Sequence, residues 1–504
     1  MALIPVVGRR SWKIRGLIAL LYVVLTLGAV TMVYPFLVML GSSVTSQYDT
    51  NSYDLLPRYL YSQPALFGKY AEDKYRADMV VINDAYGTDW AKLQDVSPPA
   101  NADAQRARDW DGFAAALPLR FKSAGFGGAV GAYSPSPLLD RYHAWLRVRF
   151  HDDIHALDRA YQQEDDTFLT VFPPFEQPTK HNWAPDQSKK GQDYAAFQKT
   201  LPAHFFQIIG GDPIYQKWLK EEAYTTLDDL NKAWGTNYKG FGEIALSERS
   251  EGNAARRKDW ETFVRTKLPF RDIVVNATAR VAYQAFLQGR YKKDISAFNK
   301  AQNAQLTSFA QIALPNPDAI PPSGPPLLDW IDFLKTTAPR NALAVDTPET
   351  RYRAWAQAKY ALTPVQASTL ALPIAASDWA YVQSHAALLR WDFLTRNYNL
   401  VIQFIGLHGN GVFVTVVYCL LAVLTAIIVN PLCAYALSRF SLSYGNTVLL
   451  FLLATMAFPA EVTMIPGFLL LKQFNFLNTF YALVLPTAAS GYSIFLMKGF
   501  FDSL

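Results

Sequence analysis

Three residues inside one apolar run have the type and spacing to line a path through a membrane. Glu461 is the only acid between positions 447 and 471, and Pro459 and Pro466 flank it. A proline inside a membrane helix frees a backbone carbonyl, which neighbouring helices or cavity water must then satisfy. A carboxylate at this depth indicates a functional site, and a structural carboxylate wetted by a cavity is the alternative. We therefore name Pro459, Glu461 and Pro466 as candidates for a translocation path.

A second pair of residues could bind a metal ion. His151 and His155 are four positions apart, a spacing that would place both on one face of a helix. No third ligand accompanies them in the sequence, and the neighbouring acids are typical of a solvated surface, so we predict neither a metal site nor a cofactor. Cys419 and Cys433 are the only cysteines and share one apolar run, which excludes a disulfide framework from the middle of the chain.

Four apolar runs are long enough to cross a membrane, which takes about 20 mostly apolar residues. They cover residues 17–40, 411–437, 447–471 and 479–497. The first run follows a basic segment, so a cleaved signal peptide is an alternative. It is longer than a usual signal sequence and ends without a clear small-residue cleavage site. The sequence thus predicts a mainly α, polytopic membrane protein with four spans, the first of them an uncleaved anchor.

The charge distribution sets the expected orientation. Residues 1–40 carry four cations and no acid, which places the N-terminus in the cytoplasm by the positive-inside rule. Residues 41–410, the middle region, would then be extracytoplasmic. Residues 411–504 carry three cations and two acids, which adds a charge of +1. Together with the four N-terminal cations, they account for the whole net charge of +5. The middle region is therefore neutral and offers no electrostatic footprint for nucleic acid. The four N-terminal cations are Arg9, Arg10, Lys13 and Arg15.

The middle region is too long to be a plain loop and must contain its own folded structure. A first pattern recurs in it: an aromatic residue, then Asn or Asp thirteen positions later, then Ala after one further residue. The copies start 75, 73, 68 and 69 residues apart, and the fifth is degenerate. They begin at Tyr70, Trp145, Trp218, Phe286 and Trp355, and the first four reach Asn83, Asp158, Asn231 and Asn299.

A second pattern alternates with the first: an aromatic residue, Phe three positions later, and Pro after five or six more. It begins at Trp110, Tyr194, Trp260 and Trp330, with a fragment at Trp391. Aromatics three apart share one helix face, and apolar residues around Trp218 recur at helical spacing. We predict about five mostly helical repeats of roughly 70 residues. The aromatics are expected in the core, and the short apolar runs at 205–209, 273–275 and 343–345 could be strands.

The last ninety residues resemble a known family. The segments Ala434–Phe440 (AYALSRF), Met456–Pro466, Phe476–Thr479 with Leu483–Pro486, and Phe495–Leu504 occur in the order of the core of maltose-type ABC permeases. The resemblance implies half of a transmembrane pore for carbohydrates in the inner, or plasma, membrane of a prokaryote. It also implies a second permease subunit, two ATPase subunits, an extracytoplasmic solute-binding protein, a sugar or oligosaccharide, and contact with membrane lipid.

In that family a loop docks on the ATPase, and it would follow Leu504, so this coupling loop is expected to be absent from residues 1–504. The chain also has no Walker-type phosphate-binding motif. We therefore expect a transporter subunit rather than an enzyme, with domains at 1–40, 41–410 and 411–504.

A different class of protein is the alternative. The segment 218–236 resembles a helix motif of some barrel-fold glycoside hydrolases, although its repetition argues against such a barrel. The chain could be a membrane-anchored carbohydrate-active enzyme, or a glycan-binding or scaffold protein, with a vestigial permease portion.

Overall fold

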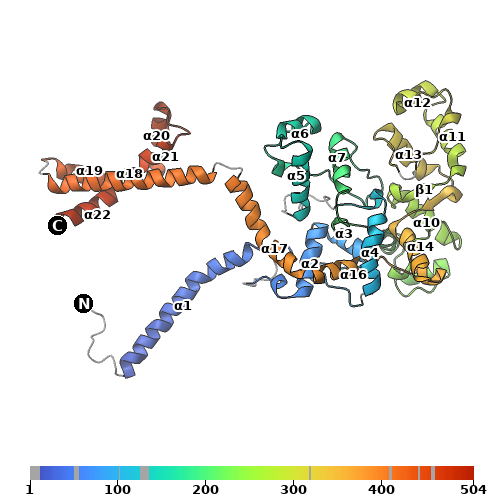
Figure 1. Ribbon diagram of the computed structural model, residues 1–504, viewed down its shortest axis with the longest axis horizontal. Coiled ribbons are helices and arrows are strands. Elements are labelled where there is room, and N and C mark those ends of the chain that lie inside the picture. Colours follow the sequence, from blue (N-terminus) through green and yellow to red (C-terminus); the bar gives the residue numbers. More distant parts are fainter. Residues whose placement is uncertain are drawn as a thin grey trace. The chain divides into compact units, whose positions relative to one another are not determined.

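The computed structural model describes residues 12–49, 56–101, 103–124, 136–316, 319–407, 411–440, 443–455 and 460–503. The chain divides into two compact parts, Met1–Asn397 and Tyr398–Leu504. Both are mainly helical (Figure 1), which confirms the predicted helical class.

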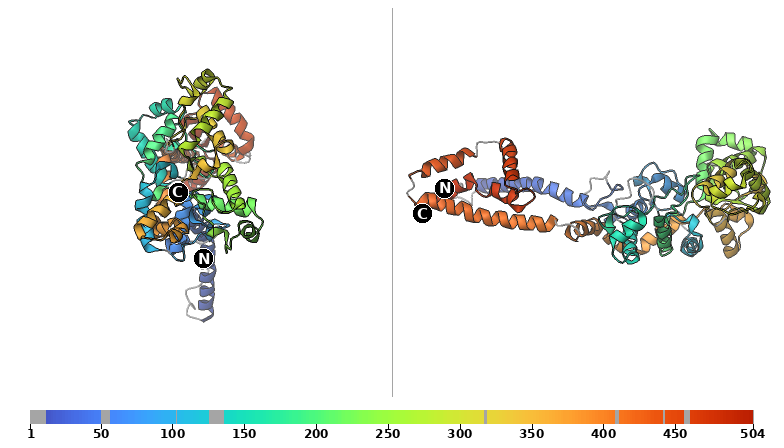
Figure 2. Two further views of the ribbon diagram at one scale, coloured as in Figure 1. Left: turned by 90° about the vertical axis from the view of Figure 1, so that its right-hand side faces the viewer. Right: turned by 90° about the horizontal axis from the view of Figure 1, so that it is seen from above.

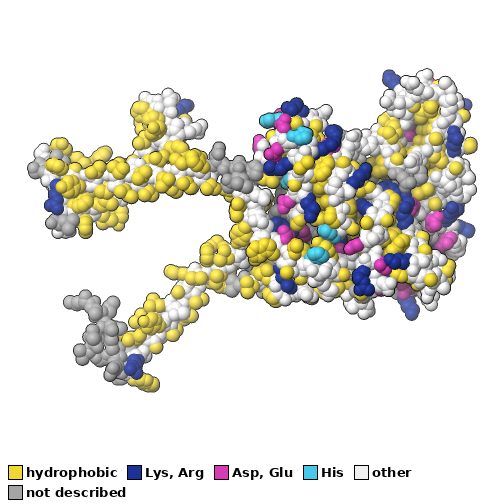
Figure 3. Space-filling model, viewed as in Figure 1, with side chains coloured by type: hydrophobic (Ala, Val, Ile, Leu, Met, Phe, Trp, Pro, Cys, Tyr) yellow, Lys and Arg dark blue, Asp and Glu magenta, His cyan; other side chains and the backbone are white. Residues whose placement is uncertain are grey.

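Helix α1 (Trp12–Ser42) is the predicted first span. It contains Pro35, and its stretch Arg15–Ser42 is long and apolar enough to cross a membrane. Its apolar side chains are exposed, as Figure 3 shows, and a helix of this kind satisfies its own backbone hydrogen bonds in lipid.

The same order of elements occurs four times after α1: a longer helix, a helix of eight residues, a short 3-10 turn and a second long helix. The first group is α2 (Gln63–Tyr75), α3 (Met79–Tyr86) and α4 (Ala104–Ala116). The second is α5 (Pro137–Arg149), α6 (Ile154–Tyr161) and α7 (Lys189–Gln198). The third is α8 (Gly211–Trp218), which continues as the π-turn η6 (Leu219–Ala223), α9 (Leu227–Trp234) and α10 (Ala254–Thr266). The fourth is α11 (Arg280–Arg290), α12 (Ile295–Gln302) and α13 (Pro325–Thr336).

A fifth group follows, with α14 (Pro348–Tyr360), the short α15 (Pro364–Ser368) and α16 (Ile374–Ser384), and α17 (Ala386–Val401) comes next. The 3-10 turns after the eight-residue helices are η2 (Leu93–Asp95), η4 (Phe168–Thr170), η7 (Phe241–Glu243) and η10 (Phe309–Gln311). Further 3-10 turns follow a proline after each second helix: η3 (Leu119–Phe121), η5 (Ala203–Phe205), η8 (Phe270–Asp272) and η11 (Arg340–Ala342). Others are η1 (Arg58–Leu60) and η9 (Ala277–Ala279).

The eight-residue helices begin and end in the same way. Each starts at a side chain that caps its first backbone N–H groups and stops at a residue in the left-handed conformation. The caps are Asp78, Asp153, Thr226 and Asp294, and the left-handed residues are Gly87, Gln162, Gly235 and Asn303.

The Asn or Asp of the first sequence pattern closes the loop after each of these helices. Asn231 Nδ2 donates to Tyr238 O at 2.9 Å, and its Oδ1 accepts from Tyr238 N at 2.9 Å. Asn83 makes the same pair of bonds with Trp90, and Asn299 with Leu306. In the second group Asp158 accepts from Asp165 N at 3.1 Å. An amide at this position can both donate to and accept from one backbone residue, which explains its recurrence.

The two predicted strands that the structure contains are β1 (Ile273–Val275) and β2 (Leu343–Val345). They pair antiparallel, with Ile273 opposite Val345. The run 205–209 forms a 3-10 turn followed by a single bridge from Gln207 to Ser123 instead of a strand.

The core consists of three clusters, and the aromatics that begin the second sequence pattern are buried in it, as predicted. In the second group, Tyr142 of α5 packs edge-on against Tyr194 of α7 at 5.9 Å between ring centroids. In the fourth group, Tyr283 of α11 packs on Trp330 of α13 at 5.4 Å. The two long helices of such a group therefore pack on each other.

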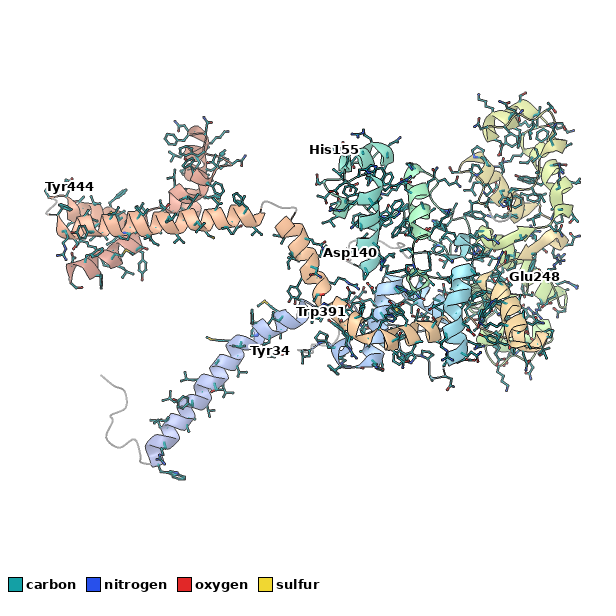
Figure 4. All side chains as sticks on the ribbon, in the orientation of Figure 1. Tyr34, Asp140, His155, Glu248, Trp391 and Tyr444 are labelled. Atoms are coloured by element: carbon teal, nitrogen blue, oxygen red, sulfur yellow. The ribbon has the colours of Figure 1, made fainter. Side chains whose placement is uncertain are left out.

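The first and fifth groups exchange their second long helices. Phe67 of α2 packs edge-on against Trp379 of α16 at 5.8 Å, and Tyr352 of α14 packs on Trp110 of α4 at 5.8 Å. We expected the last copy of the second pattern at Trp391, but Trp379 fills that place and Trp391 on α17 is exposed (Figure 4). The blue helices α2 and α3 accordingly lie beside orange α16 (Figures 1 and 2).

Contacts of α17 join the two ends of the middle region. Asn397 Nδ2 donates to Ser43 O at 2.8 Å, and Arg396 pairs with Asp73 at 2.6 Å. Arg390 donates to Tyr59 O at 3.2 Å. The chain therefore leaves and re-enters this fold at neighbouring points.

The second part begins with the end of α17 and the π-turn η12 (Ile402–Leu407). It then contains α18 (Gly411–Arg439), α19 (Gly445–Thr455), α20 (Ala460–Gln473), α21 (Phe480–Val484), η13 (Leu485–Thr487) and α22 (Gly491–Asp502). Helix α18 is the second helix long and apolar enough to cross a membrane. The predicted fourth span is a pair of helices bent by 47°. The predicted third span consists of α19 and α20 on either side of residues 456–459, which lie outside the described residues. The described residues thus contain two candidate spans, or three with the bent pair.

Candidate functional sites

Two of the three residues predicted for a translocation path, Glu461 and Pro466, belong to α20. Pro459 is outside the described residues. Glu461 is the second residue of α20, and its side chain is also outside the described set. Pro466 lies in the middle of the same helix and is exposed. Their assignment to a path remains a prediction.

A buried polar contact joins α18 to α22. Asn430 is buried although it lies in an apolar helix, and its Oδ1 accepts from Ser490 N at 2.9 Å, at the cap of α22. Ala434 and Ile494 are buried beside it. Small residues and a satisfied side-chain amide are the usual means of joining helices in a membrane.

The two histidines do not share a helix face. Helix α5 ends at Arg149, and His151 follows in a left-handed turn with φ 52°, whereas His155 is an exposed residue of α6 (Figure 4). The expectation that both histidines lie on one face of a helix is therefore wrong. No group of three potential metal-binding side chains occurs within the residues that the structure describes.

The middle region contains a cleft of about 580 Å³ where the first, third and fifth helix groups meet. Helix α3 of the first group packs on α8 of the third, and α8 packs on α14 of the fifth. A volume of 300–1,000 Å³ is typical of sites for small ligands. Residues bordering the cleft include Asp84, Tyr86, Asp212, Tyr238, Glu349 and Arg353.

Glu349 is held at the N-terminus of α8. Its two carboxylate oxygens accept from Gly211 N at 3.0 Å and Asp212 N at 3.2 Å. A Cβ atom on Gly210 would overlap this carboxylate, so the close approach requires glycine. Gly210 has no side chain with which to cap α8, and Glu349 caps it from another helix. Burial, with the nearby Asp212, raises the pKa of Glu349 to about 7.

Asp212 is paired with Arg353, one turn after Glu349 on α14. The Arg353 guanidinium forms a close ion pair with Asp212 and also donates to Leu370 O at 3.2 Å. The other oxygen of Asp212 accepts from Leu246 N at 2.9 Å. Asp212 and Glu349 are therefore both satisfied by partners in the protein, which fits a structural role for this pair.

Asp84 is different from these two acids. It lies near the end of α3, is 8 % exposed, and borders both the cleft and an adjoining hollow of about 280 Å³. Among the described residues it accepts no hydrogen bond and forms no ion pair. Burial raises its pKa to about 6, and the positive charge of Lys217 opposes that rise.

Asp84 was not among the predicted site residues, but the first sequence pattern already distinguishes its position. The residue after the loop-closing Asn or Asp is a cation in the second, third and fourth groups and an acid in the first. The cations are Arg159, Lys232 and Lys300.

Part of the chain is similar to known permeases. It is 31 % identical over 98 residues to a probable ABC transporter permease protein of Pyrococcus horikoshii. The matched segment covers 19 % of this chain and 36 % of the relative. It is 37 % identical over 95 residues to the polygalacturonan/rhamnogalacturonan transport system permease protein of Bacillus subtilis, covering 19 % and 31 %.

A third relative is the sulfoquinovosyl glycerol transport system permease protein of Agrobacterium fabrum, 31 % identical over 87 residues, covering 17 % of this chain and 30 % of the relative. The chain spans about a third of the length of these curated relatives. No family model and no solved structure matches it. These similarities support a permease-like region in a membrane protein.

Proposed function

We propose that this chain is a permease subunit of an ABC-type importer for carbohydrates and that its middle region is an extracytoplasmic sugar receptor. The observation that carries the proposal is the similarity to three permeases over about ninety residues. We assign this match to residues 411–504, because all the family-like motifs lie there.

The contacts at the ends of the middle region support its place between two spans. A domain between two consecutive membrane spans has both of its ends at the same face of the membrane. When the two spans are neighbours, these ends must lie close together. The bond from Asn397 to Ser43 O at 2.8 Å meets this requirement. The four cations at positions 9–15 favour a position of this face outside the cell.

The proposed assembly contains a second permease subunit, two ATPase subunits and a solute-binding protein, in the inner membrane of a prokaryote. Two of the relatives are named for saccharide-containing substrates, which supports carbohydrate as the cargo class. In this assembly Pro459, Glu461 and Pro466 line the path, and Asn430 fixes α18 on α22.

Purification of the affinity-tagged full chain from its native membrane tests the proposed function. We expect a second permease to co-purify in constant proportion, together with an ATPase that has a phosphate-binding loop and is held through that second permease. Recovery of the chain without any ATPase, after mild solubilisation and cross-linking, would contradict it.

The topology is testable because the chain has only two cysteines. In a Cys419→Ala/Cys433→Ala background, Lys232→Cys should react with a membrane-impermeant maleimide in intact cells. Tyr444→Cys, also exposed but in the turn before α19, should react only after permeabilisation. The reverse labelling pattern would exclude an extracytoplasmic middle region.

A further inference from the structure

We infer that the cleft between α3, α8 and α14 binds an uncharged saccharide and that Asp84 accepts hydrogen bonds from its hydroxyl groups. The inference rests on the proposed function for the choice of ligand class and names the site where the receptor would hold it. It stands on four observations: the cleft, the unpartnered Asp84, the neutralised charges around it, and the difference between helix groups.

The environment of Asp84 points to an external hydrogen-bond donor. Asp84 is only 8 % exposed, so its carboxylate has lost most of its hydration, and proteins normally compensate such a loss with a cation or hydrogen bonds. Asp84 has neither among the described residues, yet it borders two adjoining hollows of about 580 and 280 Å³. A ligand in these hollows can supply the missing donors.

The other charged groups of the cleft are already engaged. Arg353 is paired with Asp212, and Glu349 accepts two backbone N–H groups of α8. Glu243, on the exposed rim, accepts from Lys239 N at 2.9 Å.

In the adjoining hollow Lys220 pairs with Asp89, and Lys217 and Glu221 carry opposite charges. The net charge of the two hollows is therefore negative, so an acidic sugar would be repelled and neutral hydroxyl groups are favoured.

The walls of the cleft also suit a sugar. Partly exposed Tyr86 and Tyr238 border it, and tyrosine offers an apolar ring beside a polar edge. Pyranose rings present the same combination of C–H faces and hydroxyl edges. A metal ion fits less well, because the described residues contain no group of three ligands.

Comparison with the other helix groups shows that Asp84 is not required by the fold. Arg159, Lys232 and Lys300 occupy its position on α6, α9 and α12, and all three are exposed. The capping side chain is retained in all four helices, and the Asn or Asp before this position accepts a loop-closing bond in each. A position that breaks the local rule without a structural gain is expected at a functional site.

A glycosidase would need more than this site provides. The common mechanisms use two carboxyl groups on either side of the scissile bond. Asp212 and Glu349 are occupied by Arg353 and by the N-terminus of α8. Glu243 lies on the exposed rim and accepts from Lys239 N, so Asp84 has no second free carboxyl group beside it inside the cleft. The site therefore binds and does not cleave.

The test uses the purified full chain on an array of neutral and acidic oligosaccharides, followed by titration calorimetry with the best neutral ligand. The variants are Asp84→Asn and, as a matched control at the same position of α9, Lys232→Gln. We expect binding to neutral oligosaccharides, at least tenfold weaker binding by Asp84→Asn, and a change below twofold for Lys232→Gln. Thermal melting of both variants shows that they are folded.

Three results would overturn the inference: no binding to any neutral oligosaccharide, preference for acidic ones, or unchanged affinity in Asp84→Asn. Cleavage of the bound oligosaccharide would also overturn it, in favour of an enzyme. Failure of the sugar-binding test can be distinguished from failure of the permease proposal. An ATPase can co-purify with a chain whose cleft binds nothing, and the cleft can bind sugar in a chain that has no ATPase partner.

Discussion

Helices α3 and α9 have the same local design but different surroundings. Both are eight residues long, start at a capping side chain, end at a left-handed glycine and are followed by a loop closed by an asparagine. The next residue is buried Asp84 in α3 and exposed Lys232 in α9. Local capping therefore determines where each helix begins and ends. Asp84 borders a cleft because α3 packs on the neighbouring helix α8. The same frame can carry either a solvated surface or a ligand site.

The largest expected loss of stability comes from an aspartate on the helix that packs on α3 or on α9, which is α16 or α10 respectively. Asp378 of α16 accepts from Tyr86 and pairs with buried Lys74 at 2.6 Å, whereas Asp259 of α10 accepts from Tyr224 and from Trp234 Nε1. Asp378→Ala leaves a buried cation unpaired and should cost about 3–5 kcal/mol. Asp259→Ala leaves only neutral donors and should cost about 1–3 kcal/mol. Urea unfolding followed by tryptophan fluorescence measures both, and equal costs would contradict the role of Lys74.

Replacing the loop-closing asparagines tests the shared part of the comparison. Asn83→Ala and Asn231→Ala each remove three hydrogen bonds, including those from Thr88 and Thr236. At about 1 kcal/mol per bond, each should lower the free energy of unfolding by about 3 kcal/mol. The two losses should be similar in the same urea experiment. A loss confined to one helix would show that the loops are not equivalent.

Asp84→Asn should stabilise the protein, which distinguishes a functional residue from a structural one. Burial raises the pKa of Asp84 from 3.8 to about 6, so the folded chain binds this proton more tightly than the unfolded chain. Wild-type stability is therefore reduced above pH 6 and recovers as the pH falls from 6 toward 4. The variant should gain about 2–3 kcal/mol at pH 8 and nothing at pH 4.

The matched variant Lys232→Gln should change stability by less than about 0.5 kcal/mol at either pH, because its side chain is exposed. A loss of stability in Asp84→Asn at pH 8 would mean that Asp84 has a structural partner.

The affinity for the ligand should also follow the protonation of Asp84, with a smaller change in free energy than the change in stability. The groups whose charges act on Asp84 are Lys217 and Glu221 from α8 and its continuation, and Asp78 at the start of α3. With the pKa near 6, a ligand that requires the carboxylate should bind about tenfold more weakly at pH 5 than at pH 8. Calorimetry at the two pH values measures this ratio. The residual binding of Asp84→Asn should not depend on pH, and a similar pH dependence in that variant would assign the titration to another group.

The sequence predicted the local elements well because they follow from spacing and capping. The helices and the burial of Trp260 and Trp330 were within its reach. Of the three runs that could be strands, 273–275 and 343–345 are strands and 205–209 is not. It also located the recurring Asn and Asp positions, although their role in closing loops depends on hydrogen bonds that spacing alone does not show. The assignment of these elements to five repeats remains a prediction.

Long-range contacts lay beyond the sequence. Periodicity does not say which helix packs on which, so the exchange of α4 and α16 was unforeseen and Trp391 was placed in a position that Trp379 occupies. Asp84, Asp212 and Glu349 of the cleft come from segments more than a hundred residues apart. Only a comparison among the helix groups singles out Asp84, because an acid there replaces a cation.

The central claim is that the chain imports an uncharged saccharide, and uptake by intact cells tests it most directly. Cells that depend on this chain should take up the labelled neutral oligosaccharide that binds best to the purified protein. Uptake should stop when the chain is removed and should fall at least tenfold at subsaturating sugar with Asp84→Asn, while Lys232→Gln leaves it unchanged. Undiminished uptake in cells that lack the chain would contradict the account.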